Sequence, residues 1–341
     1  MTRNGLRKAD WWHIENANVR CDLCPHSCLL AEGETGFCRV RRNEGGIMTS
    51  LVYGRASSIA LDPVEKKPLY HWRPGTDILS IGTVGCSMAC PFCQNWEIAT
   101  WEKGVRLQDL GIPDVLRLVR TNNTRAVAFT YNEPLVWYEF ISDCAAVLRN
   151  EGIAVVLVSN GMIREEPLLA LLPFLSAANI DVKAFDSVTY RGLGGDLDCV
   201  KRTVERMFEA NVHVEITTLV VPGINDAPDD FAREVEWIAS VSPDIPLHLS
   251  RYFPRHRWKR PATSETLLDA MAITAGRLLR YVYLGNVNRP SDTICPKCGS
   301  IAVSRRGYDM SRTGLNAEGG CRNCGAHLYM TMDDTSRDEA S

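Results

Sequence analysis

The sequence predicts an α/β fold in which a parallel sheet curves into a (β/α) barrel, complete or as a partial TIM barrel. Two observations predict this fold class: short apolar runs alternate with helical patterns through the middle of the chain, and polar residues collect just past the apolar runs. Apolar runs of this kind between helices are typical of βα units on a parallel sheet. About six or seven units in about 220 residues suit a barrel. A doubly wound open sheet is the alternative, although no glycine-rich dinucleotide motif follows the first run.

The predicted strands occupy residues 78–81, 126–130, 154–158, 179–182, 213–221, 246–252 and 281–284. The helical patterns between them occupy residues 114–120, 135–149, 165–172, 200–210, 229–239 and 264–279. Barrel enzymes carry their chemistry at the carboxyl ends of the strands, so the residues after each strand are the first candidates for a site. The proline-rich stretch 62–75 is predicted to be a non-helical surface loop.

Charge and hydropathy exclude some classes of partner. The 341 residues carry a net charge of −3 without a basic block, so nucleic acid is not an expected partner. The apolar runs are too short to span a bilayer, and residues 1–8 lack the apolar core of a signal peptide. We therefore expect a cytoplasmic protein without a membrane partner.

The 13 cysteines are clustered, which in a cytosolic chain indicates metal sites rather than disulfides. Their positions divide the chain into four parts: an N-terminal cysteine-rich metal-binding module (1–50), the barrel (51–290), a zinc-ribbon-like module (291–330) and a polar tail (331–341). Cys144 is expected in the core, and Cys199 either there or on the surface.

The central cysteines, Cys86, Cys90 and Cys93, follow the first predicted strand in a Cys-x-x-x-Cys-x-x-Cys motif. Three thiolates can hold three irons of a [4Fe–4S] cluster, which leaves the fourth iron open to a substrate, whereas an electron carrier closes its cluster with four cysteines. The alternative is a structural zinc knuckle that uses three of the four ligands it needs.

This loop resembles that of the radical S-adenosylmethionine (SAM) enzymes. The resemblance implies that the amino and carboxylate groups of SAM chelate the open iron and that Phe92 lies near the adenine. It also implies reductive cleavage of SAM to methionine and a 5′-deoxyadenosyl radical, which abstracts hydrogen from a substrate.

Two further turns resemble SAM-binding turns of this family. Thr130, Asn132 and Glu133 stand where many members have a Gly-Gly-Glu-Pro turn for the amino group of SAM, and an N-cap with a first helical turn is the structural alternative. Ser159 and Asn160 resemble a Thr-Asn-Gly turn of the glycyl-radical-enzyme activating enzymes, and a plain turn is the alternative.

The later strands offer a second group of candidates. Alternation places Asp181 and Lys183 on one face, where the ammonium could hold the SAM carboxylate, as a similar Asp-x-Lys does in the activating enzymes, or form a structural ion pair. Glu215 and Thr217 share a strand face and could line the pocket. His248 and Arg251 lie in a segment that resembles the one closing over SAM in those enzymes.

The outer cysteines form two quartets. Cys21, Cys24, Cys28 and Cys38 can bind zinc or an auxiliary iron–sulfur cluster, and their number and spacing do not separate the two. The interleaved His26 is not expected to be a ligand, and the basic run 39–42 is expected to be a solvated face. Cys295, Cys298, Cys321 and Cys324 form two Cys-x-x-Cys-Gly knuckles, which predict a closed structural zinc site.

Taken together, the motifs of residues 15–328 resemble the radical SAM proteins of the AmmeMemoRadiSam system, which are often labelled pyruvate formate-lyase activating enzyme-like. The resemblance implies partners of the Memo and AMMECR1 types and an electron donor such as flavodoxin or ferredoxin. It implies no substrate. Two alternatives stay open: an activating enzyme that installs a glycyl radical on a partner protein, and a non-enzymatic metal-binding scaffold.

Overall fold

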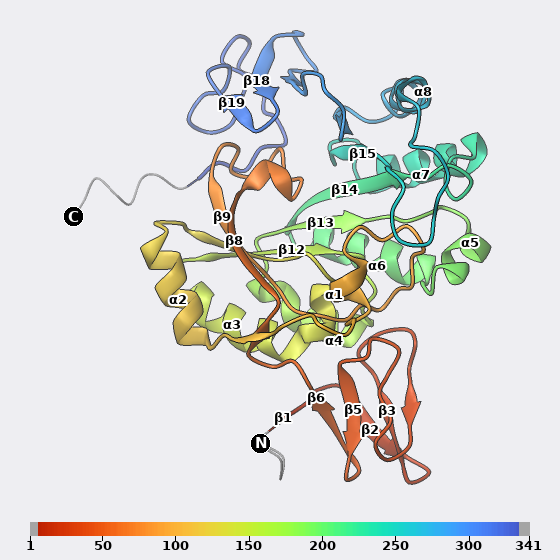
Figure 1. Cartoon of the computed structure of the whole chain (residues 1–341). Helices are drawn as coiled ribbons and strands as arrows, with labels where there is room; N and C mark the ends of the chain where they lie inside the picture. Colours follow the sequence, from red (N-terminus) through yellow and green to blue (C-terminus); the bar gives the residue numbers. More distant parts are fainter. Residues whose placement is uncertain (1–5, 334–341) are drawn as a thin grey trace.

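The computed structural model describes residues 6–333, and its centre is an eight-stranded sheet of order β16-β15-β14-β13-β12-β11-β9-β8 (Figure 1). The strands from β9 to β16 pair in parallel, and β8 pairs antiparallel with β9. Since β8 and β16 stand at opposite ends of the strand order, the sheet is a partial barrel. This confirms the predicted fold class.

The sheet consists of β8 (Ser58–Pro63), β9 (Asp77–Gly82), β11 (Ala126–Phe129), β12 (Ala154–Ser159), β13 (Ala177–Asp181), β14 (His213–Val220), β15 (Leu247–Arg251) and β16 (Val282–Gly285). The helices are α1 (Trp96–Ala99), α2 (Ile112–Thr121), α3 (Tyr138–Asn150), α4 (Glu165–Leu171), α5 (Ser187–Gly192), α6 (Leu197–Glu209), α7 (Pro228–Val241) and α8 (Glu265–Ala275). Three 3₁₀ turns are η1 (Val64–Lys66), η2 (Pro134–Trp137) and η3 (Leu172–Phe174).

Each predicted strand and helix is present, with ends shifted by a few residues. Acidic and hydroxyl side chains set several helix starts: Asp186 accepts the N–H of Thr189 at 2.8 Å at the start of α5, and Asp196 accepts that of Cys199 at 2.9 Å at the start of α6. The strand β8 and the short helices α1 and α5 lie outside the predicted elements.

The N-terminal module contains two three-stranded sheets, and a separate strand pair follows it. The module's strands are β1 (Arg7–Lys8), β2 (Trp12–Glu15), β3 (Asn18–Cys21), β4 (Leu29–Leu30), β5 (Arg41–Glu44) and β6 (Ile47–Ser50). The separate pair is β7 (Arg55–Ala56) and β10 (Gln108–Asp109). The predicted solvated face at 39–42 is wrong for Arg41, which is 1% exposed and pairs with the buried Glu139 at 2.6 Å.

The C-terminal module holds β17 (Thr293–Ile294), β18 (Ile301–Arg306) and β19 (Asp309–Ser311) in one antiparallel sheet. It lies at the amino edge of the large sheet, where the Tyr329 hydroxyl contacts the backbone of Val214 at the start of β14. Figure 1 shows the two outer modules at opposite ends of the molecule. Of the predicted polar tail, residues 334–341 lie outside the described part.

The stretch 62–75 is not the predicted surface loop. It joins β8 to β9, includes the 3₁₀ turn η1, and buries Leu69 and Trp72 to 0% and 1% exposure. Its backbone N–H groups at Tyr70 and His71 donate to the buried carboxylate of Glu215 at 3.0 and 2.7 Å. The stretch is therefore held inside the amino end of the barrel by an acceptor from another strand.

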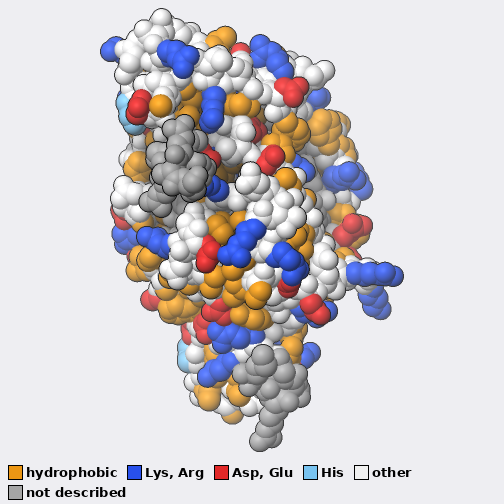
Figure 2. Space-filling view, turned by 90° about the vertical axis from the view of Figure 1, so that its left-hand side faces the viewer, with side chains coloured by type: hydrophobic (Ala, Val, Ile, Leu, Met, Phe, Trp, Pro, Cys, Tyr) orange, Lys and Arg blue, Asp and Glu red, His pale blue; other side chains and the backbone are white. Residues whose placement is uncertain are grey.

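Within residues 6–333, no helix combines the length and the apolar composition needed to cross a membrane. On the face in Figure 2, acidic and basic side chains are interspersed.

Candidate functional site

A cavity of about 320 Å³ opens at the carboxyl edge of the sheet, beside the central cysteine loop (residues 85–95) that follows β9. Its volume lies within the range of roughly 300–1,000 Å³ typical of small-molecule sites. The predicted residues that line it are Cys86, Cys90, Phe92, Cys93, Asn132, Glu133, Ser159, Asn160, Asp181 and Lys183. Strands β9 to β13 thus bring most of the predicted site into one place.

The central cysteine loop is held by the backbone of distant segments. Gly85 has φ +92°, and a Cβ there would lie 2.6 Å from the carbonyl oxygen of Cys38, so the turn requires glycine. The N–H groups of Arg257 and Trp258 both donate to the carbonyl of Pro91, at 2.8 and 2.9 Å. The loop is therefore clamped between the N-terminal module and the segment after β15.

The three central cysteines are partly buried. Burial raises the pKa of Cys86 and Cys93 and raises that of Cys90 to about 12. The N–H of Met88 points at the sulfur of Cys86 at 3.3 Å, and the Asn160 amide lies 3.8 Å from the same sulfur. Such thiols stay protonated until a metal displaces their protons, and these donors are placed to stabilise the resulting thiolate.

The spacing of the central sulfurs fits a cluster better than a zinc ion. Thiolates around one zinc lie about 3.8 Å apart, because each Zn–S bond is about 2.3 Å long. Among the described residues, only the C-terminal quartet has its ligand atoms all within 4.8 Å of one another. The wider central set suits ligands that bind different irons of one cluster.

The turn after β11 supports the central loop from the side. Tyr131 has φ +75°, so it adopts the left-handed conformation that glycine favours, and its hydroxyl donates to Asp62 at 2.6 Å. Asn132 accepts the N–H of Thr83 at 3.0 Å and donates to the carbonyl of Gly85 at 2.9 Å. Asn132 thus positions the central loop with both ends of its amide.

Glu133 joins the ends of β11 and β12. Its carboxylate accepts the Ser159 hydroxyl at 2.7 Å, the Asn160 N–H at 2.8 Å and the Leu135 N–H at 2.9 Å. Burial raises its pKa to about 7, against the effect of these hydrogen bonds. The Asn160 amide then donates to the Ser87 hydroxyl at 3.1 Å, which carries this support into the central loop.

The opposite wall carries a charged pair. Lys183 lies 3.0 Å from Asp181, and both line the cavity. Burial opposes charge on Lys183, but the carboxylate of Asp181 raises the pKa of the ammonium, which is therefore protonated. The buried hydroxyl of Thr217 also lines the cavity and has no hydrogen-bond partner among the described residues.

Thr130, His248 and Arg251 lie outside the lining, and so does Glu215. Neighbouring residues of a strand face opposite sides, so Arg251 points away from the cavity that Ser250 lines. Its guanidinium pairs with Glu265 at 3.1 Å. Ser250 lines the cavity in its place. His248 shares the inward face with Ser250 but lies deeper, toward the amino edge.

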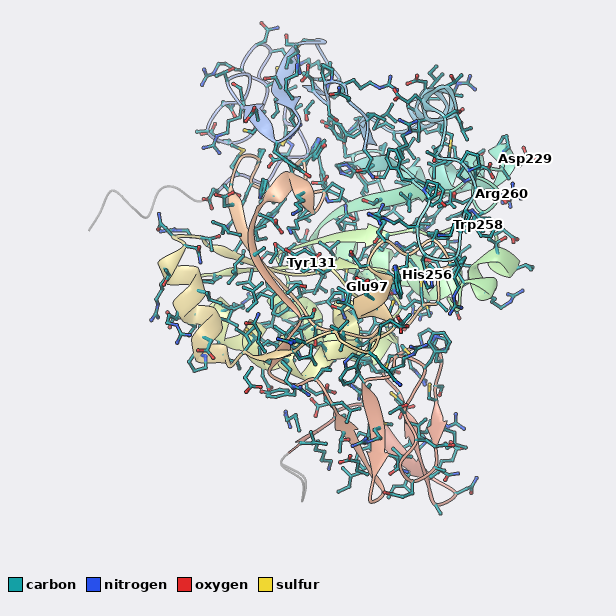
Figure 3. All side chains as sticks on the ribbon, in the orientation of Figure 1. Glu97, Tyr131, Asp229, His256, Trp258 and Arg260 are labelled. Atoms are coloured by element: carbon teal, nitrogen blue, oxygen red, sulfur yellow. The ribbon has the colours of Figure 1, made fainter. Side chains whose placement is uncertain are left out.

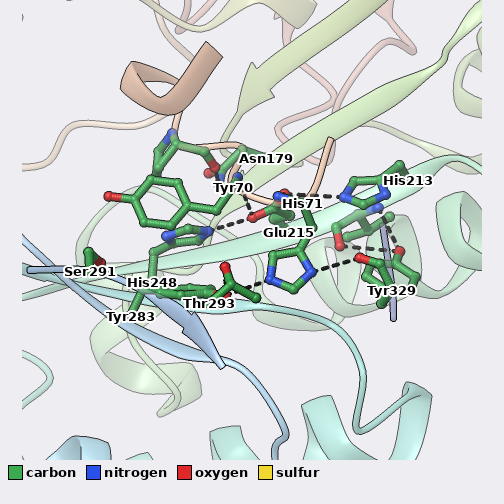
Figure 4. A network of polar contacts seen from close by, with 12 residues as sticks. Tyr70, His71, Asn179, His213, Glu215, His248, Tyr283, Ser291, Thr293 and Tyr329 are labelled. Carbon is green, nitrogen blue, oxygen red and sulfur yellow. Dashed lines mark hydrogen bonds and ion pairs between the residues drawn. The ribbon is translucent and has the colours of Figure 1, made fainter. Parts of the chain in front are cut away.

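Glu215 is the centre of a buried network at that edge (Figure 4). Besides the N–H groups of Tyr70 and His71, it contacts the imidazole of His248 at 2.6 Å and that of His213 at 3.2 Å. Although burial works against it, the hydrogen bonds of His213 and His248 hold the pKa of Glu215 well below its usual range. Glu215, which was predicted to line the pocket, instead binds the stretch 62–75 at the amino end of the barrel.

The rim of the cavity contains residues that the sequence reasoning missed. Trp96 of α1 stacks on His256 with ring centroids 4.9 Å apart, and both line the cavity together with Arg39 and Arg257. Figure 3 shows His256 on the segment between β15 and α8, which also carries Trp258. The only sequence signal was that these residues lie beside recognised motifs, since their convergence needs the folded chain.

The outer quartets differ in geometry. The N-terminal quartet lines one small cavity of about 20 Å³, and its sulfurs fall outside the 4.8 Å limit met by the C-terminal quartet. In the C-terminal quartet, the sulfurs of Cys295 and Cys324 are 3.7 Å apart and those of Cys298 and Cys321 are 3.6 Å apart. That quartet can hold a metal ion.

Comparisons with known proteins show what this chain is similar to. A model of the radical SAM superfamily matches residues 80–235. The chain is 33% identical over 335 residues to the uncharacterised protein MJ0808 of Methanocaldococcus jannaschii, covering 96% of this chain and 100% of that one. It is 28% identical over 187 residues to the pyruvate formate-lyase 1-activating enzyme of Escherichia coli, covering 51% and 74% of the two chains. The crystal structure of a domain of pyruvate-formate lyase-activating enzyme from Bacteroides vulgatus is 21% identical, with a TM-score of 0.41, over 47% of this chain and 98% of that domain.

Proposed function

This chain belongs to the radical SAM superfamily, and from that premise we propose that it binds a [4Fe–4S] cluster on Cys86, Cys90 and Cys93 and cleaves SAM reductively. When bound, the cluster supplies one electron that splits SAM into methionine and a 5′-deoxyadenosyl radical, which abstracts hydrogen from a substrate. The observation that carries the proposal is that the three central thiols and the Asp181–Lys183 pair line one cavity.

The residues on the far wall are assigned to binding. The protonated Lys183 is the partner for the SAM carboxylate, since it is the cation beside Cys90 and Cys93. The unpartnered hydroxyl of Thr217 offers a further hydrogen bond. Phe92, which is 2% exposed and lies between two cluster ligands, offers its ring for the adenine.

The residues on the near wall are assigned to positioning. Asn132, Glu133 and Asn160 use their polar groups to hold the central loop, as their hydrogen bonds show. We propose that they fix the positions of the three thiolates relative to the cavity. Lone pairs on their oxygens that take no part in these hydrogen bonds would be free to accept hydrogen bonds from the cofactor. Ser159 acts through Glu133 in the same way.

Anaerobic reconstitution of Cys90→Ala tests this proposal. The variant is expected to lose the visible absorption of the central cluster and the formation of 5′-deoxyadenosine from SAM under dithionite. Cys144→Ala is the control, because Cys144 is a cysteine of α3 that does not line the cavity. Full SAM cleavage by Cys90→Ala would end the proposal.

A second candidate is activation of a glycyl radical enzyme, because one relative is an activating enzyme. Here the 5′-deoxyadenosyl radical would take hydrogen from a glycine of a partner protein. A glycyl EPR signal on an added partner would favour this candidate. SAM turnover of any kind would exclude the remaining alternative, a non-enzymatic scaffold.

We further propose cytoplasmic reductants and partners for this chemistry. The cysteine-rich sites need a compartment that keeps thiols reduced. The proposed electron donor is a flavodoxin or ferredoxin, and the proposed partners are proteins of the Memo and AMMECR1 types. Co-purification of the tagged chain with these proteins would test the second assignment.

For the C-terminal quartet we propose zinc. Sulfur separations of 3.6 and 3.7 Å match four thiolates around one zinc ion. Such a site has no open ligand position and serves to fold its module.

A further inference from the structure

The four N-terminal cysteines line one cavity, although Cys21 ends β3 and the other three lie in the loops before β4 and β5. The cavity that they line is enclosed mainly by apolar side chains, among them Leu23, Leu135, Val136 and Met162. Cys21 and Cys38 are buried, and Cys24 and Cys28 are partly buried.

The spacing of these sulfurs points away from a single metal ion. The C-terminal quartet shows how this fold arranges four thiols for one ion, with pairs at 3.6 and 3.7 Å. Within residues 6–333, neither the N-terminal quartet nor the central triad reaches such mutual proximity. Thiolates that each bind a different iron of a [4Fe–4S] cluster must stand farther apart than thiolates that share one zinc.

The N-terminal quartet lies directly behind the central cysteine loop. Ser87 lines the N-terminal cavity, whereas its neighbour Cys86 lines the central cavity. His26 is not free to act as a ligand through Nε2, because this atom is 2.7 Å from the Ser87 carbonyl. The carbonyl of Cys38 packs against Gly85, with no room for a side chain between them. The two cysteine sites therefore lie on opposite sides of the central cysteine loop, with Cys86 in one cavity and Ser87 in the other.

We propose that Cys21, Cys24, Cys28 and Cys38 bind a second [4Fe–4S] cluster, adjacent to the one on the central loop. The N–H of Phe37, 3.4 Å from the Cys28 sulfur, is a donor to one of its thiolates. The cluster is closed by four protein ligands and keeps no open iron. The proposal rests on sulfur geometry alone and does not require that SAM is cleaved.

Metal analysis of anaerobically purified protein tests the proposal. The wild type is expected to hold about eight irons and about one zinc per chain, since two [4Fe–4S] sites and one zinc site are present. The double variant Cys24→Ser/Cys28→Ser should lose about half of the iron and keep the zinc. Cys298→Ser should lose the zinc and keep all the iron. A wild type with about four irons and about two zincs, or with about four irons and about one zinc, overturns the proposal.

EPR spectroscopy gives a second test that does not depend on the double variant folding. The reduced wild type should show two overlapping cluster signals, broadened by their mutual interaction. Cys90→Ala should keep one narrower signal that does not respond to added SAM. If Cys90→Ala has no cluster signal and no iron, the N-terminal cluster is absent. If it keeps its signal while the wild type fails to cleave SAM, only the proposed function falls.

Discussion

The two outer cysteine quartets have the same number of thiols and opposite geometries. The N-terminal quartet is spread around an apolar cavity at the carboxyl edge of the sheet, behind the central cysteine loop. The sulfurs of the C-terminal quartet lie within 4.8 Å of one another, and its module contacts the amino edge of the sheet through Tyr329. The two modules therefore attach to opposite edges of the sheet. The N-terminal module contacts the central cysteine loop, whereas the C-terminal module contacts the start of β14.

The largest expected effect is at the amino edge, at the C-terminal quartet for which we propose zinc. Cys321→Ala should lose its zinc and lower the free energy of unfolding by more than about 3 kcal/mol, because a structural zinc supplies folding energy. Its iron content and its affinity for SAM should stay unchanged. Zinc analysis and urea unfolding measure the effect. Loss of SAM cleavage without loss of stability would break the comparison, since the ribbon would then serve the chemistry.

The next effect concerns the network that joins this module to the barrel. Glu215→Ala should cost about 3–5 kcal/mol, because it leaves two backbone N–H groups and two imidazoles without their buried acceptor. Glu236→Ala, on the exposed side of α7, is the matched control. Chemical denaturation compares the two variants. Equal stabilities would show that the stretch 62–75 does not depend on Glu215.

At the carboxyl edge the expected effect is on binding rather than on stability. Lys183→Ala should raise the KM for SAM about 10- to 100-fold, the loss expected for one charge-assisted hydrogen bond to a carboxylate. Its unfolding midpoint should stay near that of the wild type, because the Asp181–Lys183 pair faces an open cavity. Lys259→Ala is the control, as an exposed lysine of the segment after β15. An unchanged KM would remove Lys183 from the cofactor site.

The barrel wall between the two edges gives the smallest effect. Burial raises the pKa of Glu234 from 4.5 to about 7, against the hydrogen bond from Thr218. Because the folded protein keeps a proton that the unfolded chain releases, stability falls as pH rises through this window. Glu234→Gln should reduce the loss of stability between pH 6 and pH 8 by about 1 kcal/mol. Denaturant titrations at the two pH values measure it, and an unchanged slope would show that Glu234 does not carry the proton.

The sequence predicted the barrel and most of the residues that line its cavity. Strands that are apolar on both faces need other elements to cover both faces, and in a parallel sheet helices do this. The alternation of apolar runs with helical patterns therefore predicted the parallel strands from β9 to β16. Strand ends of a parallel sheet meet at one edge, which brought Cys86, Glu133, Asn160 and Lys183 together as expected. Along β15, Ser250 lines the cavity, whereas the predicted His248 and Arg251 lie outside its lining.

Only the tertiary structure decided what distant groups do to one another. The stretch 62–75 is buried because Glu215, far along the chain, accepts its backbone N–H groups. Arg41 is buried because Glu139 neutralises it. The two outer quartets have different spacings along the chain, but a spacing along the chain does not contain the distance between the folded sulfurs, which only the C-terminal quartet keeps within 4.8 Å among the described residues. Local pattern selects elements and faces, whereas contact between segments sets burial, charge pairing and the size of a metal site.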